Sequence, residues 1–219
     1  MSSINPFFTM NYAQPPEYHF SHDSVFLARV VFEYIQKNQL SYSHILDLCA
    51  GCGIIGMDLL IHRLQNKLPE PLRLDFLDVQ SAYQDFYNKN WSLLKKSYSH
   101  CTTSQFFLMN YAEVKNSPGL QNQYDLITCN PPYFLKNHGK LSKSDFKNRC
   151  RFYLDSDLNN LIDAISCLLK VGGHAFVLLK SLNDHGLCTE KELISFSKIL
   201  EIRKIDSIRG TDLFEIIKL

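Results

Sequence analysis

The segment CNPPYF, residues 129–134, combines groups suited to binding a planar amino group. Asn130 carries an amide oxygen and Pro131 a carbonyl oxygen, and both can accept a hydrogen bond from an N–H group. Two successive prolines restrict the backbone and fix the direction of that carbonyl. The ring of Tyr133 can stack on a planar base, an interaction that contributes about 1–3 kcal/mol in nucleic-acid sites. We therefore predict that Asn130, Pro131, Pro132 and Tyr133 form the catalytic part of a site.

The chemistry that fits this segment is methyl transfer to an amino nitrogen. An exocyclic or amide nitrogen is a weak nucleophile because its lone pair is delocalised, so an enzyme must hold it in line with the methyl group. Acceptors for its two N–H groups stabilise the transition state, in which the nitrogen becomes more acidic, and no strong general base is needed. A purely structural Pro-Pro turn after a strand is the alternative interpretation.

A glycine-rich loop precedes this segment in the chain, with the sequence DLCAGCGIIG over residues 47–56. As Gly-x-Gly-x-x-Gly, the loop matches a dinucleotide fingerprint, in which a pyrophosphate binds at a helix N-terminus. As Asp-x-x-x-Gly-x-Gly, it matches the loop that binds the amino-acid end of S-adenosylmethionine (SAM). Asp78 ends the next apolar run and can accept hydrogen bonds from the ribose hydroxyls of either cofactor. Segment 129–134 favours SAM, because nothing else in the chain indicates hydride chemistry.

Cysteine and histidine residues offer weaker hypotheses. Cys49 and Cys52 form a Cys-x-x-Cys pair, but a zinc site needs four ligands and the sequence contains no second such pair. His19 and His22 could bind a metal, although surface or packing roles are the more common ones for such histidines. We predict no metal site and interpret the two cysteines as small residues in a tight loop.

The elements that must position these residues follow from the apolar periodicity. Helices are predicted over residues 25–36, 54–65, 81–96, 158–169 and 191–200. Strands are predicted over residues 45–49, 72–79, 105–109, 125–129, 175–179, 202–208 and 213–219. Alternating strands and helices require an α/β fold with a mainly parallel sheet, helices on both faces and an antiparallel pair at one edge.

Two local features complete this pattern. Residues 21–24 are predicted to cap the first helix, and Gly172-Gly173 to form a turn before the strand at residue 175. Residues 135–157 are polar and poorly periodic, and they follow the Asn-Pro-Pro-Tyr turn directly. This segment is a candidate substrate loop or lid.

Length and composition limit the organisation of the chain. Its 219 residues fit one domain, which we place at residues 21–219 after an N-terminal arm at residues 1–20. Positive and negative charges nearly cancel, 23 Lys+Arg against 22 Asp+Glu, so a non-specific DNA coat is not expected, although a local basic patch for RNA is compatible with this balance. Scattered cysteines and the lack of a signal sequence or membrane-spanning run predict a reduced, cytoplasmic protein.

The order of these motifs resembles a known family. The loop at residues 47–53 together with Asn-Pro-Pro-Tyr133 resembles class I SAM-dependent methyltransferases that modify amino nitrogens of adenine, guanine or glutamine. Residues 14–23, QPPEYHFSHD, are similar to the N-terminal signature of bacterial enzymes that methylate N6 of an adenine beside the anticodon of valine tRNA. The resemblance covers about residues 14–180. It implies a Rossmann-like seven-stranded sheet, SAM as the cofactor, tRNA or another structured RNA as the partner, and a monomer or weak dimer.

The resemblance also implies roles for individual residues. Asp47, Cys49, Gly51 and Gly53 would line the methionine end of SAM, Asp78 the ribose, and Asn110 the adenine amino group. The whole cofactor-binding set that it implies is Phe20, Ser21, Asp47, Cys49, Ala50, Gly51, Gly53, Asp78, Val79, Asn110, Tyr111 and Asn130. Asn130 to Tyr133 would hold the target base, and Arg151 would contact that turn or an RNA phosphate. The chain departs from the family at His19, where arginine is usual, at Cys49, often glycine, and at Asn110, often aspartate.

Alternative functions share parts of this pattern. A glutamine N5-methyltransferase of a protein substrate also carries Asn-Pro-Pro-Tyr, but usually has a separate N-terminal helical domain, and the roughly 20 residues before the first predicted helix count against this function. A DNA adenine methyltransferase normally has a larger recognition region, and a SAM-binding module without catalysis would not need the turn. If RNA is the substrate, Lys136, Lys140, Lys143, Lys147 and Arg149 are predicted to contact its phosphates.

Overall fold

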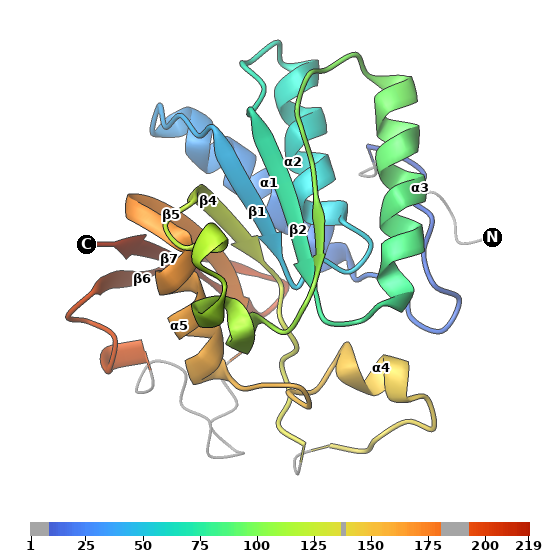
Figure 1. The fold of residues 1–219 in the computed structure, drawn as a ribbon, viewed down its shortest axis with the longest axis vertical. Helices are drawn as coiled ribbons and strands as arrows, with labels where there is room; N and C mark the ends of the chain where they lie inside the picture. The colour runs from blue at the N-terminus through green and yellow to red at the C-terminus, as the bar shows by residue number, and fades with distance from the viewer. Residues whose placement is uncertain (1–8, 137–138, 181–192) are drawn as a thin grey trace.

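A seven-stranded sheet forms the centre of the protein in this computed structural model, which describes residues 9–136, 139–180 and 193–219. The strand order is β3-β2-β1-β4-β5-β7-β6 (Figure 1). The strands are β1 (His44–Leu48), β2 (Arg73–Asp78), β3 (Phe106–Leu108), β4 (Tyr124–Cys129), β5 (Leu169–Leu179), β6 (Leu200–Ile208) and β7 (Thr211–Lys218). Strands β1 to β5 pair in parallel, and β7 pairs antiparallel with both β5 and β6. This confirms the mainly parallel sheet with an antiparallel edge.

The register brings the ends of two strands together although they are far apart in the chain. Strand β1 lies between β2 and β4, and Leu48 is paired with Cys129 and with Leu77. The glycine loop after Leu48 and the Asn-Pro-Pro-Tyr turn after Cys129 therefore leave the same edge of the sheet from neighbouring strands. Carboxyl ends of parallel strands are where open α/β sheets bind ligands.

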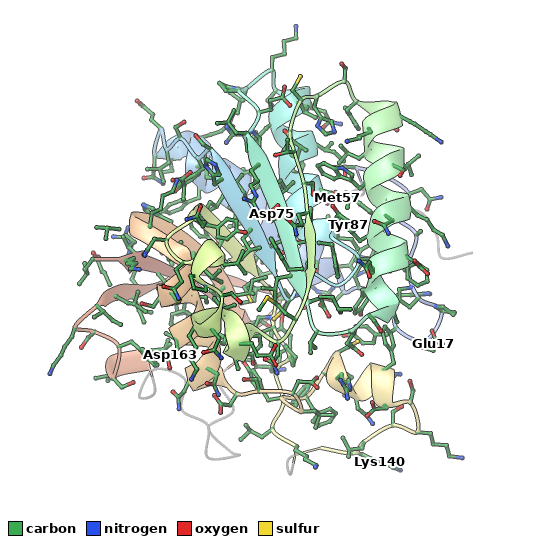
Figure 2. The ribbon with its side chains drawn as sticks, viewed as in Figure 1. Glu17, Met57, Asp75, Tyr87, Lys140 and Asp163 are labelled. Atoms are coloured by element: carbon green, nitrogen blue, oxygen red, sulfur yellow. The ribbon has the colours of Figure 1, made fainter. Side chains whose placement is uncertain are left out.

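Helices cover both faces of the sheet. The helices are α1 (His22–Lys37), α2 (Ile54–Gln65), α3 (Ala82–Ser97), α4 (Asp145–Arg149) and α5 (Leu158–Leu168), with short 3-10 helices η1 (Tyr111–Asn116) and η2 (Pro118–Leu120). Apolar residues of α1, α2 and α3 form one core cluster, which includes Met57 of α2 and Tyr87 of α3 (Figure 2). The second cluster, on the opposite face, contains α5 and the two 3-10 helices. No helix in the described part of the chain is long and apolar enough to span a membrane.

The amphipathic pattern of α5 explains its position. Leu158, Leu161, Ile162, Ile165 and Leu168 recur at helical spacing and are all buried against the sheet. Asp157 caps the helix by accepting a hydrogen bond from the Asn160 backbone N–H at 2.8 Å. The helix ends at Leu168, one residue before its predicted end.

Two local predictions differ from the structure, and a third is confirmed in part. Gly172 and Gly173 lie inside β5, where they form part of a bulge opposite Tyr124–Leu126 rather than a turn before the strand. Ser21 occupies the N-cap of α1 as predicted, but its side chain makes no capping hydrogen bond. The predicted helix at 191–200 lies partly outside the described residues; residues 193–194 are helical, 195–199 form turns, and residue 200 begins β6.

Residues 9–20 pack against the domain rather than extending from it. Met10 and Tyr12 are buried in the first core cluster. The buried Asp58 of α2 accepts hydrogen bonds from Thr9 and Tyr12. The side chain of Asn90 on α3 bonds both the N–H and the carbonyl of Ala13, at 2.7 and 3.0 Å. These bonds hold the segment over α2 and α3, and the division of the chain at residue 20 stays a prediction.

Candidate active site

A cavity of about 200 Å³ lies at the carboxyl ends of β1, β2, β3 and β4. Its floor is formed by these strand ends, and the α4 segment lies beyond the arrowheads of β1 and β2 (Figure 1). The predicted site residues that line it are Phe20, Ser21, Cys49, Ala50, Gly51, Asp78, Val79, Asn110, Tyr111, Asn130, Pro131, Pro132, Tyr133 and Arg151. The predicted residues Asp47 and Gly53 do not line it. The structure thus brings most of the predicted set into one cavity, and the individual roles stay predictions.

Asp78, the last residue of β2, places a carboxylate in the cavity wall. Its two oxygens accept backbone hydrogen bonds from Gly51 at 2.8 Å and from Gln80 at 2.9 Å. Burial raises the pKa of Asp78 to about 6 although these bonds favour the charged form. Each carboxylate oxygen has further acceptor capacity, so the group can take additional hydroxyl donors from the cavity side.

The glycine loop has a backbone conformation that side chains disfavour. Gly51 has φ +53° and Gly53 has φ +84°, in the left-handed region. A Cβ on Gly53 would also lie 2.8 Å from the Met57 side chain and 3.1 Å from the Phe76 ring. Both the backbone conformation and the lack of space therefore require glycine at this position. Cys49 has φ +58° and is a non-glycine residue in the same region. This conformation explains why glycine would suit position 49.

Asp47 lies beneath the loop rather than in the cavity wall. It is fully buried, and its carboxyl accepts hydrogen bonds from the Gly56 N–H at 2.9 Å and the Thr128 hydroxyl at 3.2 Å. Burial raises the pKa of Asp47 to about 8. These contacts connect β1 to the first turn of α2 and to the end of β4, so Asp47 holds the loop and the neighbouring strand in fixed positions. Its predicted contact with a cofactor stays a prediction.

Asn110 follows β3 and joins two walls of the cavity. Its amide oxygen accepts a hydrogen bond from Ala112 N–H at 3.0 Å and caps η1, while its amide nitrogen donates to the Asp155 carbonyl at 2.7 Å. Both ends of the amide are therefore used within the protein. The oxygen retains a second lone pair, which is the acceptor that a ligand amino group could use.

The Asn-Pro-Pro-Tyr turn is held on both sides. The Asn130 amide nitrogen donates to the Ser24 hydroxyl of α1 at 3.0 Å, and its oxygen accepts a hydrogen bond from the Tyr133 hydroxyl. The backbone N–H groups of Tyr133 and Phe134 both donate to the carbonyl of Arg151, at 3.1 and 2.9 Å. The two prolines themselves have no N–H to donate, so these bonds are the ones that connect the turn to residues 151–153.

The segment around α4 closes one side of the cavity. The Cys150 sulfur contacts the Gln80 amide at 3.3 Å and the Tyr83 hydroxyl at 3.2 Å, which joins this segment to the loop before α3 and to α3 itself. The guanidinium of Arg151 lies over the Phe134 ring at 5.6 Å and the Phe152 ring at 5.5 Å. This stacking turns a charged side chain of the polar segment 135–157 toward the predicted turn. The segment therefore contributes walls of the cavity, and a five-residue helix, rather than only a loop.

Sequence reasoning missed several residues of the cavity. Ser24 belongs to the capping segment of α1, so a polar residue there is expected for local reasons. The one indication of a site was that it directly follows residues 14–23, which resemble the family's N-terminal signature. Gln80 and Tyr83 follow Asp78 at the start of a predicted helix, so nothing in the sequence marked them as site residues. Arg149, which was predicted to contact RNA phosphates, also lines the cavity. The other lining residues that the sequence did not point to are Tyr18, Cys52, Ile54, Ile55, Leu77, Met109, Phe134, Cys150, Phe152, Tyr153, Leu154, Asp155 and Ser156. Cys52, Ile54 and Ile55 belong to the glycine-rich segment 47–56 and Phe134 to the segment 129–134, so their motifs were found but their side chains were not assigned to the site. The residues of the segment 152–156 have no local pattern that marks a site. Among the residues that the structure describes, no group of three or more histidine, cysteine or acidic side chains is arranged to hold a metal.

The fold and the position of the cavity define a Rossmann-like class I methyltransferase fold. Solved structures with this fold include the CurJ carbon methyltransferase, with a TM-score of 0.57 and 14% identity over 92% of this chain and 56% of that chain. They also include the N-methyltransferase NodS from Bradyrhizobium japonicum WM9 bound to S-adenosylhomocysteine, with a TM-score of 0.54 and 14% identity over 89% of this chain and 87% of that one. At such identity the similarity concerns the fold alone.

Curated relatives give a narrower comparison. The chain is 26% identical to the tRNA1(Val) (adenine(37)-N6)-methyltransferase of Shewanella sediminis, over 77% of this chain and 64% of that protein. It is 27% identical to the protein of the same name from Flavobacterium psychrophilum, over 81% of this chain and 67% of that protein. The matched region thus spans about two thirds of the length of these relatives. No protein-family model matches the chain.

Proposed function

We propose that the protein is a SAM-dependent methyltransferase that methylates the exocyclic N6 amino group of an adenine in tRNA. The observation that carries the proposal is the placement of Asn130–Tyr133 and of Gly51 with Asp78 in the walls of one cavity. The names of the curated relatives support the adenine acceptor and the tRNA substrate. A tRNA substrate agrees with the predicted cytoplasmic location.

The residues of the cavity fit SAM. The Asp78 carboxylate faces the cavity with acceptor capacity to spare, as two ribose hydroxyls require. A Cβ on Gly51 would meet nothing nearer than the Tyr83 ring at 3.5 Å, so the loop leaves this wall open. Phe20, Val79 and Met109 supply apolar surface for an adenine ring, and Asn110 an acceptor for its amino group. Cys49 and Ala50 would contact the methionine end.

The mechanism follows from the groups around Asn130. When bound, SAM supplies an electrophilic methyl group on sulfur. The Asn130 amide oxygen and the Pro131 carbonyl accept the two N–H bonds of the target amino group, which holds the nitrogen in line for direct displacement. Tyr133 stacks on the base and excludes water from that face. The amino nitrogen becomes acidic as it gains the methyl group, so its surplus proton leaves to water without a strong base.

The fold does not select the acceptor, because CurJ is named as a carbon methyltransferase and NodS as an N-methyltransferase on the same architecture. The Asn-Pro-Pro-Tyr turn restricts the acceptor to a planar amino group but fits adenine and the glutamine amide alike. A glutamine N5-methyltransferase of a protein, or one acting on another RNA or DNA amino group, is therefore the competing function.

One experiment separates these acceptors. Methyl-labelled SAM is incubated with the protein and with separate pools of tRNA, rRNA, DNA and protein, and the labelled nucleoside or amino acid is identified by chromatography. We expect label in tRNA as N6-methyladenosine. Label in N5-methylglutamine or in another nucleic acid would refute the tRNA assignment, and no transfer to any pool would refute the methyltransferase assignment.

The substitution Asn130→Ala tests the chemical role of the turn. Removing the amide acceptor should lower the rate of methyl transfer about 100-fold or more, as the loss of one oriented transition-state partner does elsewhere. Binding of S-adenosylhomocysteine should change little, because the glycine loop and Asp78 are intact. Asn88→Ala on the exposed face of α3 is the matched control. Unchanged transfer by Asn130→Ala would contradict the mechanism.

A further inference from the structure

The amide of Asn130 is the one side-chain acceptor on which the proposed mechanism depends, and its orientation is not fixed by the prolines. The terminal torsion of asparagine is broad, and a half-turn exchanges its oxygen and its nitrogen. An amide turned the wrong way would present N–H donors to the N–H groups of the target nitrogen. Some other group must therefore hold the side chain.

Among the described residues, Tyr133 and Ser24 hydrogen-bond to opposite ends of this amide. Tyr133 donates to the amide oxygen, which is the atom that the target amino group needs. Ser24 accepts from the amide nitrogen at 3.0 Å, on the side that the substrate does not use. A phenol is a better donor than acceptor, so the Tyr133 hydroxyl selects the oxygen in the free protein. The Ser24 contact holds the amide from its nitrogen end and uses neither lone pair of the oxygen.

Ser24 is also the more rigidly placed of the two. Its residue is only 8% exposed and lies in the first turn of α1, while Tyr133 belongs to the turn itself. Helix α1 is anchored by Leu27, Ala28 and Val31, all with 0% exposure in the core between α1, α2 and the sheet. The hydroxyl of Ser24 therefore has a fixed position relative to β4, although it comes from 106 residues earlier in the chain.

We propose that Ser24 is a positioning residue, which holds the Asn130 side chain from its amide nitrogen so that the amide oxygen stays directed toward the target amino group. This inference rests on the proposed function for its kinetic consequence. It also makes a statement about the free protein that does not depend on any substrate. α1 thus becomes part of the acceptor site, in addition to covering the sheet.

Ser24→Ala and Ser24→Thr test the role of Ser24 in two measurements. With methyl-labelled SAM and a valine-tRNA transcript, Ser24→Ala should lower kcat about 10- to 100-fold, because a misoriented acceptor costs rate in this range. KM for the transcript and the Kd of S-adenosylhomocysteine should stay within about twofold, since neither the stacking ring nor the cofactor wall changes. Ser24→Thr keeps the hydroxyl and should recover most of kcat. Ser92→Ala, a helical serine on the exposed face of α3, is the matched control.

The second measurement requires no substrate. In NMR spectra of the free protein, the side-chain amide signals of Asn130 should shift or broaden in Ser24→Ala and remain near their original position in Ser24→Thr. A kcat for Ser24→Ala within twofold of the original protein, or unaltered Asn130 amide signals, would overturn the proposal. A protein that methylates no RNA but shows the amide shift would refute the proposed function and leave the positioning contact supported.

Discussion

At the scale of the residue, the protonation state of Asp78 that favours folding is the opposite of the one that favours cofactor binding. Burial raises the pKa of Asp78 from 3.8 to about 6, and the nearby Asp155 adds to this rise. Because the folded-state pKa lies above its ordinary value, the carboxyl contributes stability below pH 3.8 and loses that contribution as the pH rises to about 6. Ribose hydroxyls donate hydrogen bonds to the charged carboxylate. Ionisation of Asp78 therefore lowers the stability of the fold but is required for binding the cofactor's ribose.

A pH series tests this assignment of Asp78. The affinity for S-adenosylhomocysteine, measured by calorimetry, should be constant above about pH 7 and should fall as the pH decreases through about 6. Asp78→Asn should bind more weakly at pH 8 and lose this dependence, because an amide does not titrate. Asp155→Asn removes a neighbouring charge outside the ribose contact and should shift the midpoint to lower pH. An Asp78→Asn variant that keeps the original pH profile would show that another group titrates.

At the scale of the element, Glu215 of β7 connects its own strand to helix α1 and to strands β5 and β6. Its carboxylate is 0% exposed and accepts hydrogen bonds from Tyr34 at 2.8 Å, His174 at 2.7 Å and Arg203 at 2.6 Å. Burial alone would raise the pKa of Glu215, but these bonds outweigh it and hold the pKa below its ordinary 4.5. The network therefore stabilises the fold above pH 4.5 and is lost as the pH falls through the lowered value.

The substitution Glu215→Gln should lower the free energy of unfolding by about 2 kcal/mol at pH 7, since hydrogen bonds to charged groups contribute roughly 1.5–3 kcal/mol. Urea denaturation with matched m-values measures this difference. Glu201→Gln on β6, whose side chain is 53% exposed, should change stability by no more than about 0.5 kcal/mol. Equal effects of the two substitutions would mean that the buried network has no special contribution.

At the scale of the whole molecule, the nearly neutral charge leaves RNA binding to a local surface. The basic residues after the turn are not equivalent, because Arg149 is paired with Asp145 at 3.0 Å and Asp155 at 2.9 Å. Lys140 lies at the outer edge of this segment (Figure 2). Four lysines of the segment remain for phosphate contacts: Lys136, Lys140, Lys143 and Lys147.

Replacing these four lysines with glutamine should weaken tRNA binding and make its dependence on log salt concentration shallower by about 3, since each phosphate contact contributes roughly 0.7–0.9 to the slope. Filter binding over a salt series measures both effects. The affinity for S-adenosylhomocysteine should not change, because these side chains do not line the cavity. The matched control replaces Lys89, Lys95, Lys96 and Lys115. Equal loss of affinity in the two variants would place the RNA surface elsewhere.

Much of the fold could be predicted from the sequence because its signals are local. Apolar periodicity located α2 at its observed ends and most other helices and strands within about three residues, but β5 begins at Leu169 rather than at residue 175. The short helix α4 and the bulge in β5 were missed, since five residues are too few for a periodic pattern and a glycine pair reads equally well as a turn. The rule that parallel strands share their carboxyl edge then sufficed to bring Gly51, Asp78 and Asn130 into one predicted site.

The tertiary structure decided what local patterns do not contain. The sheet order places β1 beside β4, so Asp47 reaches Thr128 across 81 residues and supports the loop from below instead of lining the cavity. In the folded protein both ends of the Asn110 amide are hydrogen-bonded to other protein groups, and Ser24 of the first helix contacts Asn130. Sequence determined the chemical groups and the strand ends that carry them, because both are properties of short segments. Which groups meet, and in what orientation, depends on packing between segments far apart in the chain, and only the folded structure specifies that.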